Sequence, residues 1–280
     1  MNLNKIKSHA KINLTLSVVG KSKKLHKIES IVAFIDLYDL ISIKKIRSKN
    51  HLIVFKGKFK KKINSNNTVS KLLNILEKKK MIDQKFYIKI IKNIPQESGL
   101  GGGSMNAANI LRSFIKKKII KIDKKKAYEI SNDIGSDVIL GLEPTNSIIT
   151  SKNKIIRFRK CKKFFTLIVK PNFGCSTKEI YAKVNKFDKV KKHRYSKKMF
   201  NLEYLKKEHN SLEQVALNRY PFLKKIKSYL GKLESPIFVR MTGSGSALVS
   251  YYYSKKQCDK AKKLFSKKYK KYWCVSSKTI

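Results

Sequence analysis

Residues 94–109 read IPQESGLGGGSMNAAN, which places four glycines and a serine between a strand-like and a helix-like segment. Glycine permits positive φ angles and has no side chain, so successive backbone N–H groups can turn toward an anion. A helix that begins after such a loop adds its dipole and unpaired N–H groups. Ser104 supplies a hydroxyl that could cap the helix or face a phosphate and its metal. The stretch is typical of a phosphate site, although a glycine-rich turn without a ligand could look the same.

Two common phosphate loops do not match these residues. The stretch lacks the GK[S/T] ending of a Walker P-loop and the GxGxxG fingerprint of a dinucleotide site. A second glycine turn, TGSGS at residues 242–246, lies between strand-like segments, where a plain hairpin would also explain it. The first loop is therefore the stronger candidate, and it is a phosphate loop of a different type.

Composition limits the class of protein. A chain of 280 residues can bury a substantial core as one large domain or two lobes. No apolar run reaches the ~18 residues of a membrane helix, and the start lacks the apolar core of a secretory signal. The four cysteines, Cys161, Cys175, Cys258 and Cys274, have no CxxC spacing, which favours free thiols over a zinc or redox site. We therefore expect a cytoplasmic protein with no membrane partner.

The formal net charge of +48 raises the question of nucleic-acid binding. The lysines occur in nearly every segment instead of forming one stripe, and arginine, the better phosphate reader, appears only seven times. A compositional drift toward lysine on solvated faces explains this pattern better than a dedicated nucleic-acid site does. Such a field would still attract an anionic small molecule.

Strand and helix patterns alternate along the chain without internal repeats. Apolar alternation predicts strands over 11–20, 28–37, 39–46, 51–57, 86–95, 147–158, 163–171, 238–241, 247–253 and 272–278. Helical spacing predicts helices over 68–82, 106–120, 124–135, 204–233 and 255–270. The polar, charged segment 184–198 is typical of a flexible connection. We expect a two-lobed α+β protein with lobes at 1–155 and 156–280.

The loop pattern P-x3-GLGGGS-x-NAA resembles the phosphate loop of the galactokinase, homoserine, mevalonate and phosphomevalonate kinase superfamily. Within it, the chain is most similar to the kinases that act on a cytidine-diphosphate-linked methylerythritol in the non-mevalonate isoprenoid route. Seven segments occur in that family's order over nearly the full length: AKINLTL, His26 with FIDLYDLISI, the glycine loop, IGSDV, GCSTKEIY, HNSLEQVAL and RMTGSGSALV. The resemblance implies an N-terminal nucleotide-binding lobe, a C-terminal substrate lobe, ATP and Mg²⁺ as cofactors, and this alcohol as the small-molecule substrate, in a monomer or weak homodimer.

The resemblance also implies residue roles. Asp137 in IGSDV matches the catalytic aspartate, and Lys11 in AKINL matches the lysine that pairs with it. Each alone has a plainer interpretation, since an aspartate after GS is more often a helix cap and most lysines here are surface groups. The implied ATP-binding residues are Pro95, Gly99, Leu100, Gly101, Gly102, Gly103, Ser104, Asn106 and Asn67, of which Asn67 could equally be a helix cap. The implied substrate-binding residues are Asn13, His26, Leu25, Thr177 and Tyr181, and the turn 242–246 is expected to support that lobe.

Two positions depart from the family pattern. Members usually carry a tyrosine that stacks on cytosine directly before His26, where this chain has Leu25. Tyr181 would then be the remaining aromatic wall, while His26 would hydrogen-bond the base. Met105 replaces a small polar residue in the loop. We therefore expect weakened cytidine recognition and altered loop contacts, with the catalytic pair intact.

Two alternatives remain open. A sister kinase of the same superfamily, acting on homoserine or mevalonate, would share the loop but need no cytosine pocket; His26, the short N-terminus and the RMTGSGS segment argue against it. A lysine-rich nucleic-acid-binding protein would instead show a basic patch localised on one face.

Overall fold

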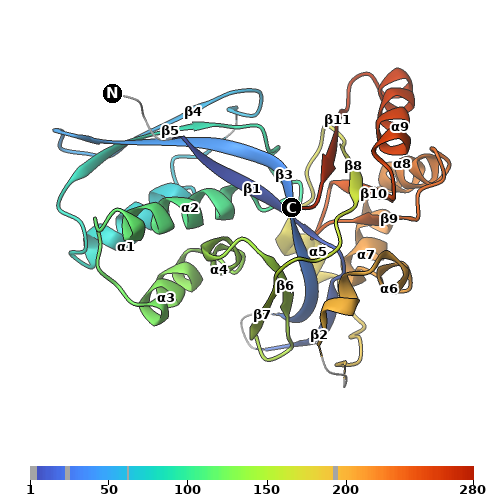
Figure 1. Ribbon diagram of the computed structural model, residues 1–280, viewed down its shortest axis with the longest axis horizontal. Helices are drawn as coiled ribbons and strands as arrows, with labels where there is room; N and C mark the ends of the chain where they lie inside the picture. Colours follow the sequence, from blue (N-terminus) through green and yellow to red (C-terminus); the bar gives the residue numbers. More distant parts are fainter. Residues whose placement is uncertain (1–4, 23–25, 62, 192–194) are drawn as a thin grey trace. The chain divides into compact units, whose positions relative to one another are not determined.

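The computed structural model describes residues 5–22, 26–61, 63–191 and 195–280. It contains two sheets and several helices, labelled in Figure 1, which confirms the predicted α+β class. Two compact units are present: the described residues of Met1–Ala10, Leu37–Gln96 and Gly101–Pro144 form the first, and Lys11–Asp36, Glu97–Leu100 and Thr145–Ile280 form the second. The expected lobe boundary near residue 155 stays a prediction.

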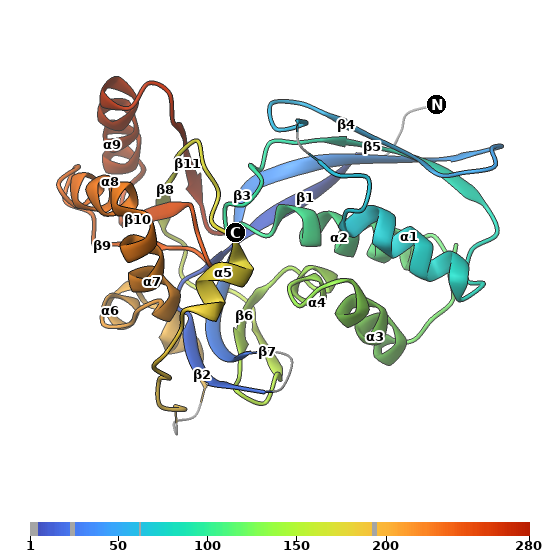
Figure 2. The same ribbon diagram turned by 180° about the vertical axis from the view of Figure 1, so that it is seen from behind.

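The first unit places helices on one face of a sheet. Strand β5 (Lys85–Ile91) alternates buried and half-buried residues, so Phe86, Ile88 and Ile90 face the core. It pairs antiparallel with the second half of β3 (His26–Ile46) and parallel with β4 (Leu52–Lys56). Figures 1 and 2 show α1 (Thr68–Lys78) and α2 (Gly102–Lys116) along the inner face, packed in turn against α3 (Lys124–Ile134) and α4 (Val138–Leu142). The sheet and α1 therefore fix the position at which α2 begins.

The second unit is built on an antiparallel sheet in the order β11-β8-β10-β9. Its apolar side chains share one core with those of the helices that follow them in sequence. The strands are β8 (Phe165–Lys170), β9 (Phe238–Met241), β10 (Leu248–Tyr252) and β11 (Trp273–Lys278), and the helices are α5 (Thr177–Ala182), α6 (Leu202–Lys206), α7 (Ser211–Arg219), α8 (Pro221–Gly231) and α9 (Lys255–Lys268). The first half of β3 also pairs here, with β2 (Ser17–Lys21) and β6 (Asn146–Ile149), and β6 pairs with β7 (Ile155–Phe158).

Strand β3 is one strand of 21 residues, where the sequence predicts two strands, over 28–37 and 39–46. The aspartates near the predicted break do not end it, because each carboxylate accepts hydrogen bonds. Asp36 accepts from the Ser277 hydroxyl, and Asp39 accepts from two backbone N–H groups. A polar residue inside a strand is tolerated when it has such partners.

The predicted helix over 204–233 is three helices, α6, α7 and α8. Asn210 caps α7 and Pro221 begins α8, so each break falls at a residue suited to a helix start. Helices α4 and α5 are missing from the prediction because five or six residues are too few to show helical spacing. All four cysteines are free thiols, as predicted. Over the described ranges, no helix has both the length and the apolar character needed to cross a bilayer.

Candidate active site

Helix α2 begins in the first unit without a side-chain cap. Gly101 occupies the N-cap position with φ 69° and ψ 15°, a left-handed conformation that favours glycine, and it makes no side-chain capping hydrogen bond. Ser104 lies inside the first turn and not at the cap, so of the two roles considered for its hydroxyl only the phosphate contact stays a prediction. The first-turn N–H groups thus have no capping side chain, which is the condition for binding an anion there.

At two glycines of this turn, a Cβ atom would lie close to neighbouring side chains. A Cβ at Gly102 would lie 2.9 Å from Cγ2 of Ile94 and 3.3 Å from Nζ of Lys92. At Gly103 it would lie 3.1 Å from Oγ1 of Thr68, whose hydroxyl donates to the Gly103 carbonyl over 2.8 Å. Gly102 is therefore required by packing, while Gly103 is exposed and adjoins only one side chain. Pro95, in the loop that follows β5, is buried.

A buried polar cluster, whose Lys92 and Asp39 are not among the residues predicted from the sequence, supports the start of α2. The Lys92 ammonium pairs with the carboxylate of Asp39, which also accepts from Nδ2 of Asn106 over 3.0 Å. All three residues are at most 4% exposed. Asn106, predicted to bind ATP, is thus held by Asp39 inside the unit, and its Oδ1 has no hydrogen-bond partner among the described residues. The available signal was an aspartate within one apolar-patterned segment and a lysine directly after another, because an unpaired buried charge is costly.

Asn67 caps helix α1. Its Oδ1 accepts from the backbone N–H groups of Val69 and Ser70, and Ser70 Oγ in turn accepts from the Asn67 N–H, which completes a capping box. The capping alternative for Asn67 is therefore confirmed. A contact with the adenine side of ATP stays a prediction.

Asp137 occupies the N-cap position of α4 but makes no capping hydrogen bond. Its backbone is helical, with φ −83° and ψ −13°, and its side chain is half-buried. The plainer interpretation of this aspartate as a helix cap is therefore not supported by its geometry. The catalytic role stays a prediction.

Met105 belongs to the core of the first unit. Its side chain is fully buried, and a Cβ added at Gly141 would lie 3.1 Å from its sulfur. The side chain packs toward α4, so the expectation that it alters loop contacts with the nucleotide finds no support in its position.

Lys11 begins a hydrogen-bonded chain in the second unit. It is 4% exposed, and its Nζ donates to Oδ1 of Asn13 over 2.6 Å. Nδ2 of Asn13 donates to the Ser30 hydroxyl over 2.8 Å, and the Asn13 backbone N–H donates to Oγ1 of Thr242 over 2.9 Å. Lys11 also donates its backbone N–H to the Leu100 carbonyl over 3.0 Å. A buried ammonium oriented in this way is not one of the chain's solvated surface lysines.

Side-chain hydrogen bonds also hold the turn at 242–246 within the second unit. Thr177 and Ser244 share a hydrogen bond of 2.8 Å between their hydroxyls, and Asn210 Nδ2 donates to the Met241 and Gly243 carbonyls, each over 2.8 Å. Gly99, with φ +73°, lies so close to the Thr242 carbonyl that no side chain would fit. A plain hairpin needs none of these contacts, so neighbouring segments of this unit fix the conformation of the turn.

His26 and Tyr181, both predicted to face the cytosine base, lie together in the second unit. Their ring centroids are 5.0 Å apart with the planes inclined by 37°. Burial, with a smaller contribution from the Lys21 charge, lowers the pKa of His26 below its ordinary 6.5. The imidazole is therefore neutral at neutral pH and can accept as well as donate a hydrogen bond. Leu25 lies outside the described residues.

The predicted residues divide between the two units. The first unit contains Pro95, Gly101, Gly102, Gly103, Ser104, Asn106, Asn67 and Asp137. The second contains Gly99, Leu100, Lys11, Asn13, His26, Thr177 and Tyr181. Most of the residues predicted to bind nucleotide are thus in one unit, and the described residues predicted to bind substrate are all in the other.

Comparison with known proteins gives matches over the whole chain. Residues 67–143 match the family described as GHMP kinases N terminal domain. A 4-diphosphocytidyl-2-C-methyl-D-erythritol kinase from Pelagibacter ubique (strain HTCC1062) is 54% identical over 281 residues, which cover 100% of both chains. A protein of the same name from Clostridium botulinum (strain Langeland / NCTC 10281 / Type F) is 36% identical over 260 residues, covering 88% of this chain and 90% of that protein.

Solved structures share the fold. A crystal structure of 4-(cytidine 5'-diphospho)-2C-methyl-D-erythritol kinase has a TM-score of 0.77 at 20% identity, covering 98% of both chains. A homoserine kinase from Cytophaga hutchinsonii ATCC 33406 has a TM-score of 0.71 at 14% identity, covering 99% of this chain and 94% of that one.

Proposed function

Because the chain belongs to the 4-diphosphocytidyl-2-C-methyl-D-erythritol kinase family, we propose that it transfers the γ-phosphoryl group of ATP to the 2-hydroxyl of that substrate. The observation that carries the proposal is the 54% identity over the full length of the relative from Pelagibacter ubique. In the second unit, the buried Lys11 ammonium and the polar turn at 242–246 supply charged and polar groups that can bind an alcohol substrate. The enzyme acts in the cytoplasm as a monomer or weak homodimer, on a small molecule and not on nucleic acid.

The start of α2 holds the ATP phosphates. Its uncapped N–H groups and helix dipole supply donors and partial positive charge without a side chain between them and the ligand. The described residues contain no group of three or more His, Cys, Asp or Glu side chains placed to hold a metal. Mg²⁺ fits beside ATP phosphates because it usually keeps several waters and binds through one or two carboxylates plus substrate phosphates. When bound, it would neutralise charge on the phosphates, with the Ser104 hydroxyl as a candidate ligand.

Asp137 accepts the proton of the acceptor alcohol. As the hydroxyl oxygen bonds to the γ-phosphorus, the bond to the β-phosphate oxygen breaks, ADP leaves, and the proton passes to the carboxylate. Lys11 matches the lysine that pairs with this aspartate in the family, and its ammonium stabilises the charge that develops on the acceptor oxygen. The hydrogen bond to Asn13 sets the direction of the ammonium.

The second unit recognises the acceptor. Asn13 and Thr177 offer polar groups to the methylerythritol part. His26 hydrogen-bonds the cytosine, and Tyr181 stacks on it.

A coupled ADP-release assay with a panel of acceptors tests the proposal. The panel contains the cytidine-diphosphate-linked methylerythritol, the same alcohol without cytidine, homoserine and mevalonate, each at saturating ATP and Mg²⁺. We expect turnover with the first and little with the others. Preferred turnover of homoserine or mevalonate would replace the proposal with a sister kinase of the superfamily.

A further inference from the structure

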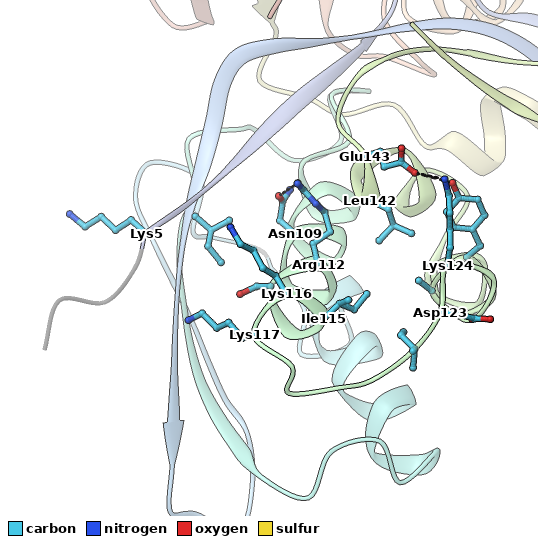
Figure 3. Close-up of a pocket in the computed structure, with 15 residues that line it drawn as sticks. Lys5, Asn109, Arg112, Ile115, Lys116, Lys117, Asp123, Lys124, Leu142 and Glu143 are labelled. Atoms are coloured by element: carbon cyan, nitrogen blue, oxygen red, sulfur yellow. Dashed lines mark hydrogen bonds and ion pairs between the residues drawn. The ribbon is translucent and has the colours of Figure 1, made fainter. Parts of the chain in front are cut away.

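The first unit contains a cavity of about 850 Å³ at the end of α2 opposite to Gly101. It is lined by the last turns of α2, the first turns of α3, the end of α4 and the beginning of β1 (Ile6–Asn13). Figure 3 shows Ile115 and Leu142 facing the space between α2 and α3, with Arg112 beside Asn109 at one end. The volume is within the usual range for small-molecule sites. Arg112 is ten residues beyond Gly102, where α2 begins, so it lies about 15 Å along the helix from that start.

The acidic groups of the cavity already have partners. The Glu143 carboxylate pairs with the Lys124 ammonium over 2.9 Å, drawn in Figure 3, and accepts from the Tyr128 hydroxyl over 3.3 Å. Asp123 caps α3 by accepting from the Lys126 backbone N–H over 2.7 Å. The two acids are still outnumbered by the cations of the lining, which are Lys5, Arg112, Lys116, Lys117 and Lys124, so the cavity carries a net positive charge.

Arg112 is oriented by a buried hydrogen-bonded chain. Its Nη1 donates to Oδ1 of Asn109 over 3.1 Å. Nδ2 of Asn109 is itself engaged, donating to the Met105 carbonyl over 2.9 Å and to the Ser8 hydroxyl over 3.3 Å. Asn109 and Ser8 are 5% and 0% exposed, so the amide cannot turn freely, and it presents a fixed acceptor to the guanidinium. One nitrogen of the planar fork is held while its other N–H groups remain available to a ligand.

Arginine is the rarer basic residue of this chain, so its presence at position 112 is informative. Lysine supplies 59 of the 66 basic residues (66 minus seven arginines), so most cationic positions do not require a guanidinium. A guanidinium differs from an ammonium in offering a planar pair of donors to carboxylate or phosphate. Ile115, Ile122 and Leu142 provide an apolar surface in the same cavity.

We propose that this cavity is a second ligand site, which binds a small organic anion whose phosphate or carboxylate pairs with Arg112. The apolar part of the ligand lies against Ile115 and Leu142, between α2 and α3. The site is separate from the ATP site proposed at the start of α2, and it does not depend on that assignment.

Calorimetric titration with hexyl phosphate tests the proposal, with inorganic phosphate and hexanoate as companion probes. The whole chain is used, at 0.15 M salt to screen the general positive field, with a non-hydrolysable ATP analogue and Mg²⁺ saturating the nucleotide site. We expect saturable binding of hexyl phosphate at one site and weaker binding of inorganic phosphate, which lacks the apolar part. Hexanoate binding would extend the ligand class to carboxylates, and binding of phosphate probes alone would restrict it to phosphates.

Arg112→Met should weaken hexyl phosphate binding at least about tenfold, since a charge-assisted pair is lost. Arg112→Lys keeps the charge but not the fork, so an intermediate loss is expected. Arg47→Met is the control, because Arg47 is an exposed arginine of the same unit outside the cavity lining. Ile115→Ala should weaken hexyl phosphate binding more than phosphate binding. The proposal is overturned if no probe binds, if a folded Arg112 variant binds as the parent does, or if Arg47→Met has the same effect as Arg112→Met.

Discussion

The two glycine-rich turns of this protein use glycine for different purposes. At the start of α2, Gly101 leaves the first helical turn without a side-chain cap, and the backbone N–H groups are the proposed ligand contacts. In the turn at 242–246, Thr177 and Asn210 bind the turn through hydrogen bonds, and the side chains around it are the proposed ligand contacts. The difference indicates a nucleotide side built from backbone and an acceptor side built from side chains. Variants in the first unit should therefore affect ATP, and variants in the second should affect the acceptor.

Asp137→Asn gives the largest expected effect, because Asp137 is proposed to accept the proton of the acceptor alcohol. It is the exception among the first-unit residues, since it serves the acceptor and not ATP. The amide keeps the shape and removes the basicity, so kcat should fall roughly 10²- to 10⁴-fold. Steady-state assays and calorimetry with ATP check this, and ATP affinity should stay close to that of the parent. Lys11→Met should also lower kcat, and the double variant should lose less than the product of the two single losses if the residues act as a pair. Near-normal turnover of Asp137→Asn would exclude it as the base.

Tyr181→Ala tests the acceptor side. Loss of a stacking ring is worth roughly 1 to 3 kcal/mol, so the KM for the cytidine substrate should rise by about 5- to 150-fold with little change in kcat. The base is remote from the transferred phosphoryl group and contributes equally to ground and transition states. Leu25→Tyr should lower the same KM by restoring a second ring. Tyr253→Ala, at an exposed tyrosine of the same unit, is the control. An unchanged KM in Tyr181→Ala would remove GCSTKEIY from the substrate site.

Gly103→Val tests the nucleotide side. A side chain there adjoins only Thr68, so the fold should persist while the branched side chain obstructs the phosphates. We expect the KM for ATP to rise by about tenfold or more, with the acceptor KM and the melting temperature nearly unchanged. Gly102→Val is a less selective change, because its side chain would meet Ile94 and Lys92 and should also lower stability by about 1 to 3 kcal/mol. Unaltered ATP kinetics in a folded Gly103→Val would make the turn purely structural.

The sequence predicts elements and motifs better than it predicts supporting contacts. Most strands and long helices follow from apolar periodicity, and the glycine loop follows from its composition. The pairing of Lys92 with Asp39 is not predictable in this way, because the two residues are 53 positions apart and come together only when β3 pairs with β5. Periodicity also does not predict the hydrogen bond from the Asn106 side chain to the Asp39 carboxylate. Side chains that support a site are placed by tertiary packing, which a local pattern does not encode.

A matched pair of threonines gives the smallest effect and the sharpest comparison. Thr68 donates to the Gly103 carbonyl in the first unit, and Thr177 shares a hydrogen bond with Ser244 in the second, each over 2.8 Å. Valine keeps the shape and removes only the hydroxyl, so each change costs about 0.5 to 1.5 kcal/mol, or roughly two- to tenfold. Thr68→Val should raise the KM for ATP and leave that for the acceptor, and Thr177→Val should do the opposite. Both constants are measured for both variants, with each second substrate saturating, and melting curves control for stability. If both variants raise the same KM, the division into a nucleotide side and an acceptor side is wrong, because an identical chemical change in either unit would then affect one common ligand.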